Sequence, residues 1–238
     1  MNLIDTHFHL DFYQDHKRWY EYINQHKQYT LCVTNSPGVY YSCKRIYPET
    51  KYLKFALGYN PKNVNSERFD KRLFNHLLGE TKYIGEVGLD FTGKLKDKQK
   101  EQVQIFDYIC AAVSNCQILS IHSNHAEKTV LEILMHNRVK KAIMHWYSGD
   151  LQTLNELIRN GYYFSINSNM INSPKGQVII RTIPMDKILI ESDGPFTKIY
   201  SKRYDPSKLQ NTYRQLGEFL KCERIEAMIW NNFNSLLS

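Results

Sequence analysis

The sequence contains no apolar run long enough to cross a bilayer, and its first residues lack the charged-then-apolar pattern of a secretory signal. It also lacks any C-x-x-C pair. The odd number of scattered cysteines argues against a disulfide framework or a thiolate zinc site: Cys32, Cys43, Cys110, Cys116 and Cys222. These absences predict a cytoplasmic protein without a membrane partner, whose reduced thiols are mostly buried as small apolar groups.

Nothing in the sequence marks a domain boundary. There is no low-complexity segment, internal repeat or linker rich in proline, glycine or serine within the 238 residues. Because α/β barrels often reach this length as one unit, we expect a single domain over residues 1–238. A G-x-G-x-x-G segment is also missing after the first apolar run, which weighs against a dinucleotide-binding domain.

Eight short apolar runs recur along the chain, each followed by a polar stretch. Runs of this kind are typical of strands buried on both faces of a parallel sheet. They occupy residues 2–5, 29–34, 52–59, 83–87, 118–121, 141–145, 162–166 and 187–191. Apolar stripes predict helices at 99–114, after His125, at 150–160 with Asp150 as N-cap and Gly161 as left-handed stop, and at 223–237.

Strands that alternate with helices in one domain predict a (β/α)8 TIM-type barrel. A doubly wound open sheet is the alternative, because the order of the strands cannot be read from one sequence.

The segment I-D-T-H-F-H at residues 4–9 places two histidines one residue apart. Side chains alternate between faces in an extended strand, so His7 and His9 point the same way and can converge on one ion. Surface histidines and hydrogen-bonded core histidines also occur at this spacing. A metal site therefore requires partners elsewhere in the chain.

Such partners stand at the ends of later runs. Glu86 lies near the end of the fourth run, His122 and His145 end the fifth and sixth, and Asp193 follows the eighth. In a barrel these ends form one face, where active sites are built. Singly, each residue has a structural explanation, such as a turn or a core histidine.

Together, four imidazoles and two carboxylates fit two divalent ions that share a bridging carboxylate, for which Glu86 is the natural candidate. Zinc, manganese, iron and nickel suit imidazole ligands, and the carboxylate oxygens also admit magnesium.

The net charge of +7 and the pI near 9.0 favour an anionic partner. Two basic clusters follow ligand-bearing runs, where both are expected to rim the metal mouth and neutralise phosphates: Lys94, Lys96, Lys98 and Lys100, and Lys198, Lys202 and Arg203. Four aromatic residues follow such runs as well, as candidates for stacking bases of a single strand: Phe91, Trp146, Tyr147 and Phe196. Solvated loops and core packing are the respective alternatives.

The motifs D-x-H-x-H-L, G-E-x-G-L-D, I-H-S, H-x-x-S-G and E-S-D-G-P, in this order over residues 5–195, resemble those of the TatD family of metal-dependent deoxyribonucleases in the amidohydrolase-like barrel superfamily. The segment N-N-F-N at 231–234 resembles the last helix of that family. The resemblance implies two divalent ions, with His7 and His9 on one and His122 and His145 on the other. It places Glu86 between them as a catalytic residue and makes Asp193 a ligand and proton acceptor.

One position departs from the family pattern. Where the family usually has G-x-H-P, this chain has G-Y-N-P at residues 58–61, so Asn60 replaces a histidine. Asparagine can hydrogen-bond a phosphate oxygen but does not shuttle protons near neutral pH. Asn60, Trp146 and Arg203 are the candidate substrate contacts.

Segments 118–123, 144–149, 162–176 and 191–196 are similar to those of TatD-type nucleases in the Qat anti-phage defence systems. This implies partners among the Qat-system proteins, including an ATPase. The expected activity is metal-dependent, exonucleolytic hydrolysis of DNA phosphodiester bonds at single strands or ends. The alternatives are a bimetal hydrolase of amide, ester or lactone bonds and a non-catalytic subunit of a defence complex.

Overall fold

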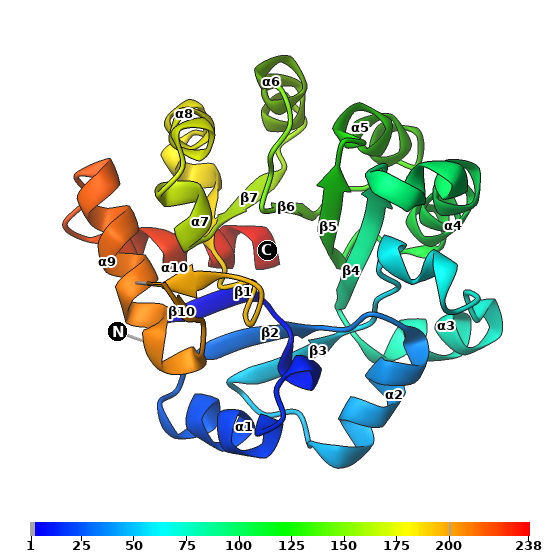
Figure 1. The fold of residues 1–238 in the computed structure, drawn as a ribbon, viewed down its shortest axis with the longest axis horizontal. Helices are drawn as coiled ribbons and strands as arrows, with labels where there is room; N and C mark the ends of the chain where they lie inside the picture. Colours follow the sequence, from blue (N-terminus) through cyan, green and yellow to red (C-terminus); the bar gives the residue numbers. More distant parts are fainter. Residues whose placement is uncertain (1–2, 200) are drawn as a thin grey trace.

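Eight parallel strands form the centre of the molecule in a computed structural model that describes residues 3–199 and 201–238 (Figure 1). They follow one another around the centre in chain order. Their bounds are β1 (Ile4–Phe8), β2 (Tyr29–Val33), β3 (Leu53–Ala56), β4 (Tyr83–Asp90), β5 (Ile118–Asn124), β6 (Ala142–His145), β7 (Tyr163–Ile166) and β8 (Ile188–Ile190).

The strands close into a barrel. Continuous ladders join β1 to β3 and β4 to β8, all in parallel. Two parallel bridges connect these sheets, between Leu57 and Ile84 on one side and between Phe8 and Gly194 on the other. The TIM-type barrel is therefore confirmed, and the open-sheet alternative is excluded.

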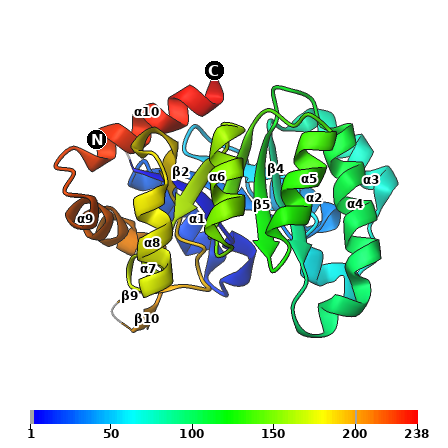
Figure 2. The same cartoon turned by 90° about the horizontal axis from the view of Figure 1, so that it is seen from above.

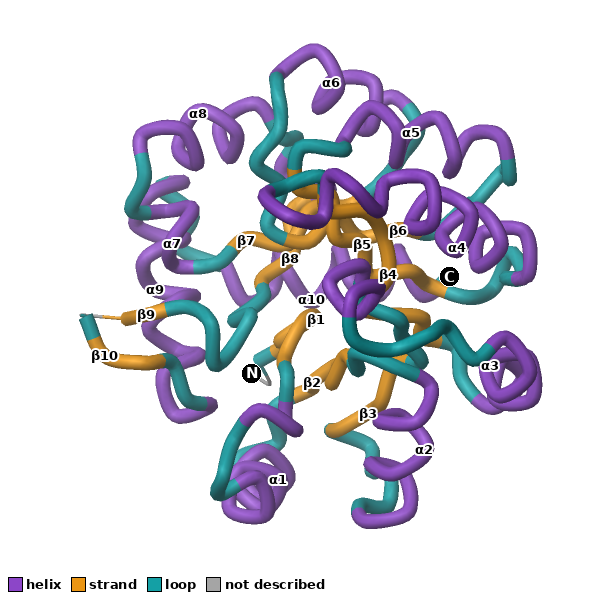
Figure 3. The backbone as a smooth tube through the Cα atoms, turned by 45° about the vertical axis from the view of Figure 1, so that its right-hand side comes forward, coloured by secondary structure: helices purple, strands orange, loops and turns teal. Residues whose placement is uncertain are grey.

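Helices surround the barrel on its outside (Figure 3). Their bounds are α1 (His16–Gln25), α2 (Pro37–Ile46), α3 (Lys71–Leu77), α4 (Gln99–Ala112), α5 (Glu127–His136), α6 (Leu151–Arg159), α7 (Ser168–Ile171), α8 (Pro174–Thr182), α9 (Leu209–Leu220) and α10 (Ile225–Leu237). The four predicted helices correspond to α4, α5, α6 and α10. The predicted limits of α6 are confirmed, because Asp150 Oδ1 accepts a hydrogen bond from the Thr153 N–H at 2.8 Å and Gly161 has a φ of +84°.

The two ends of the barrel differ (Figure 2). At the amino end, Leu236 of α10 packs with apolar side chains at the starts of β5 to β8. Asn232 fixes this helix by donating to the carbonyls of Met185 and Ile188 at 2.7 and 2.8 Å. At the carboxyl end, β9 (Lys198–Ile199) and β10 (Lys202–Arg203) form an antiparallel hairpin that was not predicted, because two-residue strands show no alternation of apolar and polar side chains.

Several predicted strand ends are shifted. The first strand runs over Ile4–Phe8 rather than 2–5, and Asn2 lies outside the described residues. Strands β4 and β5 continue past the predicted ends to Asp90 and Asn124. The reason is the same each time, because polar residues that face the barrel mouth interrupt the apolar pattern while the backbone ladder continues.

The cysteines of the described residues are all free thiols. Cys32, Cys43 and Cys110 are buried, Cys222 is half-buried and Cys116 is exposed. Within the same residues, no helix combines the length and apolar character that a membrane span needs.

Candidate metal centre

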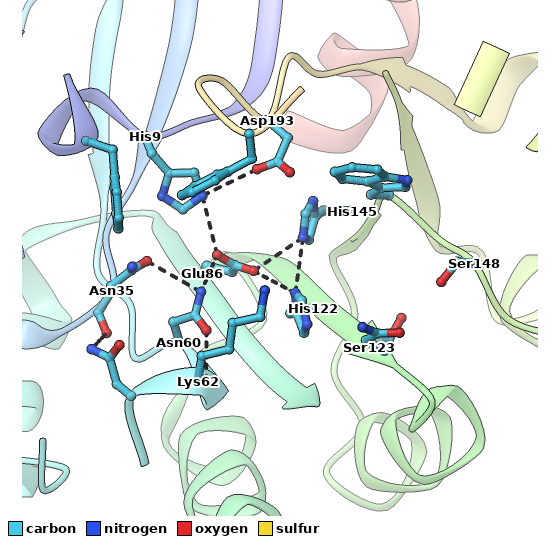
Figure 4. Close-up of a pocket in the computed structure, with 15 residues that line it drawn as sticks. His9, Asn35, Asn60, Lys62, Glu86, His122, Ser123, His145, Ser148 and Asp193 are labelled. Carbon is cyan, nitrogen blue, oxygen red and sulfur yellow. Dashed lines mark hydrogen bonds and ion pairs between the residues drawn. The ribbon is translucent and has the colours of Figure 1, made fainter. Parts of the chain in front are cut away.

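Six predicted ligands converge at the carboxyl end of the barrel, and Figure 4 labels all of them except His7. They are His7 in β1, His9 just after it, Glu86 in β4, His122 in β5, His145 at the end of β6 and Asp193 in the loop after β8. All six side chains are buried. Burying so many titratable groups costs free energy unless they are paired or bind an ion. This arrangement thus points to a metal centre.

Glu86 lies between two pairs of imidazoles. Its Oε1 is 2.8 Å from Nδ1 of His122 and 3.3 Å from Nε2 of His145. Its Oε2 is 3.4 Å from Nε2 of His9 and 3.7 Å from Nε2 of His7. Each carboxylate oxygen thus faces a different pair, which is the placement expected of a bridging ligand.

Asp193 lies with the first pair. Its Oδ1 is 3.5 Å from Nε2 of His9 and 3.7 Å from Nε2 of His7. The backbone holds it there, because the N–H of Asp193 donates to the His7 carbonyl and the N–H of His9 donates to the Gly194 carbonyl, both at 2.9 Å. Asp193 adopts a φ of +46°, a conformation rare outside glycine that is often found at functional sites.

The donor atoms fit divalent metal ions. Within the described residues, the ligand atoms of His7, His9 and Glu86 lie within 4.8 Å of one another, as do those of Glu86, His122 and His145. A third such group combines His7 and His145 with Asp193. Imidazole nitrogens mixed with carboxylate oxygens are typical ligands of zinc and related transition metals.

The side of each imidazole that faces away from the centre has its own environment. Nε2 of His122 donates to Oδ2 of Asp90 at 2.9 Å, and Nδ1 of His7 lies 2.8 Å from the Ser120 hydroxyl. Nδ1 of His145 lies 3.4 Å from Oε2 of Glu191, within ion-pair distance but without a hydrogen bond, and Nδ1 of His9 likewise has no hydrogen-bond partner among the described residues. Such partners fix the orientation of metal-binding histidines.

Sequence reasoning missed Asp90 and Glu191, although both stand inside the quoted motifs. The signal was available: each is a carboxylate two or four residues from a predicted ligand, at the end of an apolar run.

Between β4 and β5, Gly88 makes room for His122. A Cβ at Gly88 would come within 2.0 Å of the His122 carbonyl oxygen.

The two central carboxylates are ionised near neutral pH. Burial opposes this charge, but hydrogen bonds from His122, His145 and His7 hold the pKa of Glu86 well below its usual value. For Asp193 burial is likewise outweighed, by the hydrogen bond from His9 and the charges of neighbouring imidazoles, and its pKa is lowered. Both residues are therefore suited to bind cations.

A cavity of about 640 Å³ opens above this centre. Its lining combines aromatic side chains with amide, lysine and serine side chains. The aromatic side chains are Phe12, Trp146 and Phe196, and the other lining residues besides the metal ligands are Asn35, Asn60, Lys62, Asn63, Ser123, Asn124 and Ser148. Figure 4 shows Asn35, Asn60 and Lys62 together on one side of Glu86, and Ser123 and Ser148 on another. A cavity of this size is typical of small-ligand sites.

The three predicted substrate contacts lie at different places. Asn60 lines the cavity, where its Nδ2 donates to Oε2 of Glu86 at 2.6 Å and its Oδ1 accepts from the Lys62 N–H at 2.9 Å. Trp146 also lines the cavity, with a φ of +40°. Arg203 lies outside the lining, and its guanidinium donates to the Phe12 carbonyl at 3.4 Å.

Two of the aromatic residues expected to stack bases at the mouth do not line the cavity. Tyr147 is buried and donates its hydroxyl to the Asp150 carbonyl at 2.7 Å, and Phe91 packs against the core. Within the described residues, the cavity lining includes Lys62 but no residue of either basic cluster. Lys62 and Phe12 were missed because each lies in a short 3₁₀ turn, Pro61–Asn65 and Leu10–Phe12, which has no recognisable pattern.

A parallel eight-stranded barrel with imidazoles and carboxylates buried at its carboxyl end is the architecture of a metal-dependent hydrolase. The TatD related DNase family matches residues 4–238, almost the whole sequence. The chain belongs to this family of metal-dependent hydrolases.

Individual relatives agree with this placement. The chain is 24% identical over 220 residues to an uncharacterized metal-dependent hydrolase of Buchnera aphidicola, with 82% of each protein covered. It is 33% identical over 118 residues to human deoxyribonuclease TATDN3, an alignment that covers 47% of this chain and 42% of the human protein. The fold matches the crystal structure of YjjV, a TatD homolog from Escherichia coli, with a TM-score of 0.86 and 19% identity over 98% of this chain and 97% of the other.

Proposed function

We propose that this chain is a deoxyribonuclease that hydrolyses DNA phosphodiester bonds with two divalent metal ions. The observation that carries the proposal is the position of Glu86, whose two carboxylate oxygens face separate histidine pairs. His7 and His9 would hold one ion with Asp193, and His122 and His145 would hold the other. When bound, the ions would supply charge neutralisation at a phosphodiester and activation of a water molecule.

The chain's own groups then have defined tasks. Glu86 keeps its two oxygens apart, with Oε2 fixed by the Asn60 amide. Asp193 is ionised near neutral pH and faces His9 through Oδ1, which leaves Oδ2 to accept a proton from the attacking water. Lys62 brings a positive charge to the cavity wall, where it suits a phosphate.

The cavity supports action on strand ends. It is closed by the metal ligands at its base and is of a size that holds small ligands, so it suits a terminal nucleotide better than a continuous duplex. We therefore propose exonucleolytic cleavage at single strands or ends. Asn60 and Trp146 would contact the terminal nucleotide, and Arg203, outside the cavity, would contact the strand beyond it.

A substrate panel tests the scissile bond. Related barrels of the same fold include an uncharacterized amidohydrolase from yeast, with a TM-score of 0.77, so the fold alone does not select the reaction. With manganese, magnesium or zinc, we expect cleavage of phosphodiesters and none of amides, carboxylic esters or lactones. Amide or lactone cleavage without nucleotide release would replace the proposed function by the alternative hydrolase.

We further propose, from the sequence resemblance in segments 118–123, 144–149, 162–176 and 191–196, that the chain is the nuclease of a Qat-type anti-phage defence system. Its partners would then be the ATPase and the other proteins of that system. Cells carrying the whole system are expected to lose protection from phage when this chain carries His122→Ala and Asp193→Ala together. Protection that survives both changes would instead support a structural subunit.

A further inference from the structure

Two phenylalanines form an exposed aromatic pair at the cavity mouth. Phe12 and Phe196 are 41% and 51% exposed, and both line the cavity. Their ring centroids are 5.0 Å apart with an interplanar angle of 66°. A single exposed aromatic ring is ordinary, but two rings in contact beside a buried polar centre form an apolar surface that suits a ligand.

This Phe12–Phe196 pair contacts the metal centre directly. Both rings stand edge-on to His9, with centroid distances of 5.5 Å for Phe12 and 5.2 Å for Phe196. A group that rests on the pair therefore lies next to the ligands of the first metal site.

The pair is also held by a rigid frame. Phe12 follows β1 and Phe196 follows β8, and the two segments are joined by the hydrogen bond from the His9 N–H to the Gly194 carbonyl at 2.9 Å. The Tyr13 hydroxyl adds a bond to the Tyr204 carbonyl, also at 2.9 Å. The aromatic surface is therefore in place before a substrate arrives.

The side of the cavity away from His9, against which both rings pack, has complementary chemistry, because Lys62 lies across Glu86 from His9 (Figure 4). Lys62 is exposed there, and Asn63 beside it donates to the Asn35 carbonyl at 2.9 Å. The cavity thus offers an apolar ring surface on one side, a positive charge on the other and the metal ligands between them. A nucleotide has matching parts, because its base is flat and aromatic and its phosphate is anionic.

We propose that the Phe12–Phe196 pair stacks the base of the nucleotide next to the scissile phosphate, while Lys62 faces the phosphate. This inference rests on the proposed nuclease function and adds the residues that select an unpaired base. A base in a duplex is already stacked and paired, so it must be unstacked before it reaches the pair. Preference for single-stranded ends follows.

The test is a scan with an abasic nucleotide. Single-stranded oligonucleotides carry one abasic residue, moved along the strand, and kcat/KM is measured for the neighbouring linkage. For the unsubstituted chain we expect a fall of about 5- to 150-fold when the abasic residue occupies the stacked position, and little change elsewhere. In a Phe12→Leu, Phe196→Leu variant, ordinary DNA should be cleaved more slowly and the abasic penalty should disappear.

Leucine keeps the apolar packing on His9 but removes the aromatic face, so this variant is expected to fold. Lys62→Ala should lower activity while retaining the abasic penalty. Tyr41→Ala, an exposed aromatic residue of α2 outside the cavity lining, should change neither.

A binding measurement separates this inference from the proposed function. The dissociation constants of the metal-free chain for intact and abasic oligonucleotides report stacking without catalysis. Weaker binding of the abasic strand, lost in the double leucine variant, supports the pair even if no phosphodiester is cleaved. Equal binding and equal cleavage of both strands would overturn the stacking role while leaving the nuclease intact.

Discussion

Asp90 accepts a hydrogen bond from Nε2 of His122 at 2.9 Å, and this contact turns Nδ1 of the same ring toward Oε1 of Glu86 at 2.8 Å. Asp90 is buried, which opposes its charge, but the hydrogen bonds from His122 and Thr92 lower its pKa to about 2. Asp90 therefore stays negatively charged near neutral pH and can make His122 a better metal ligand.

The Asp90→Asn variant should bind the ion at His122 and His145 less tightly. Removing a partner of this kind typically costs about 10- to 100-fold in metal affinity. Metal titration by calorimetry is expected to show one weakened site and one that is unchanged. Asp97→Asn, at an exposed position, is the matched control. If Asp90→Asn bound each of the two ions as tightly as the wild type does, the role of Asp90 in positioning His122 would be contradicted.

Asn60 is expected to position Glu86 rather than only contact substrate. Asn60→Asp keeps the acceptor that caps the Pro61–Asn65 turn but loses the amide that donates to Glu86 at 2.6 Å. A hydrogen bond to a charged group contributes about 1.5–3 kcal/mol, so kcat should fall by about 10- to 100-fold. Thermal denaturation measures the stability that is lost as well, because the buried aspartate faces the ionised Glu86, and Asn60→Gln tests whether the amide alone suffices. Full activity in the aspartate variant would refute this assignment.

Lys62 should carry part of the salt dependence of DNA binding. Each phosphate contact on a single strand adds about 0.7 to the magnitude of the slope of log K against log salt concentration. Lys62→Ala is expected to reduce that slope by this amount, whereas Lys128→Ala, on the exposed side of α5, leaves it unchanged. The binding constant is measured with metal-free protein between 50 and roughly 200 mM salt, where counterion release dominates. An unaltered slope would place the phosphate elsewhere.

Asp150 should stabilise α6 in a pH-dependent way. Its carboxylate accepts hydrogen bonds from the backbone and side chain of Thr153, and these bonds lower its pKa in the folded state. A lowered folded-state pKa means that the stabilisation is present above the unfolded-state pKa and is lost as the pH falls through the folded-state value. Asp150→Ala should cost about 1 kcal/mol at neutral pH.

Urea denaturation at neutral pH and near pH 3 checks this. The difference in the free energy of unfolding between wild type and Asp150→Ala should be smaller at the acid pH. Asp150→Asn keeps a capping oxygen that does not titrate, so its stability difference from Asp150→Ala should persist. If the free energies of unfolding of wild type and Asp150→Ala differed equally at both pH values, the charge of Asp150 would not be involved.

The barrel could be predicted from the sequence because its eight strands are short, apolar and separated by amphipathic helices. The metal ligands could be predicted because His122, His145 and Asp193 lie where the apolar runs of the sequence end. The exact strand limits could not be predicted, because Asp90 and Asn124 pair in the ladder between β4 and β5 without continuing the apolar pattern of either strand.

The residues of the cavity walls were the part of the site that could be predicted least well from the sequence. Phe12 and Lys62 lie in short turns, and their position depends on tertiary contacts such as the bridge between Phe8 and Gly194. The basic clusters were visible, but a run of lysines specifies neither the direction of the side chains nor their distance from the metal ligands. Tyr147 follows a ligand in sequence yet turns into the core.

This centre is expected to hydrolyse DNA in a metal-dependent reaction. The most direct test measures nucleotide release from end-labelled single- and double-stranded DNA with manganese, magnesium, zinc or a chelator, beside Asp193→Ala. We expect stepwise shortening that is faster on single strands, requires metal and is lost in the variant. Intact DNA under every metal, from a chain shown by calorimetry to bind two ions, would contradict this expectation.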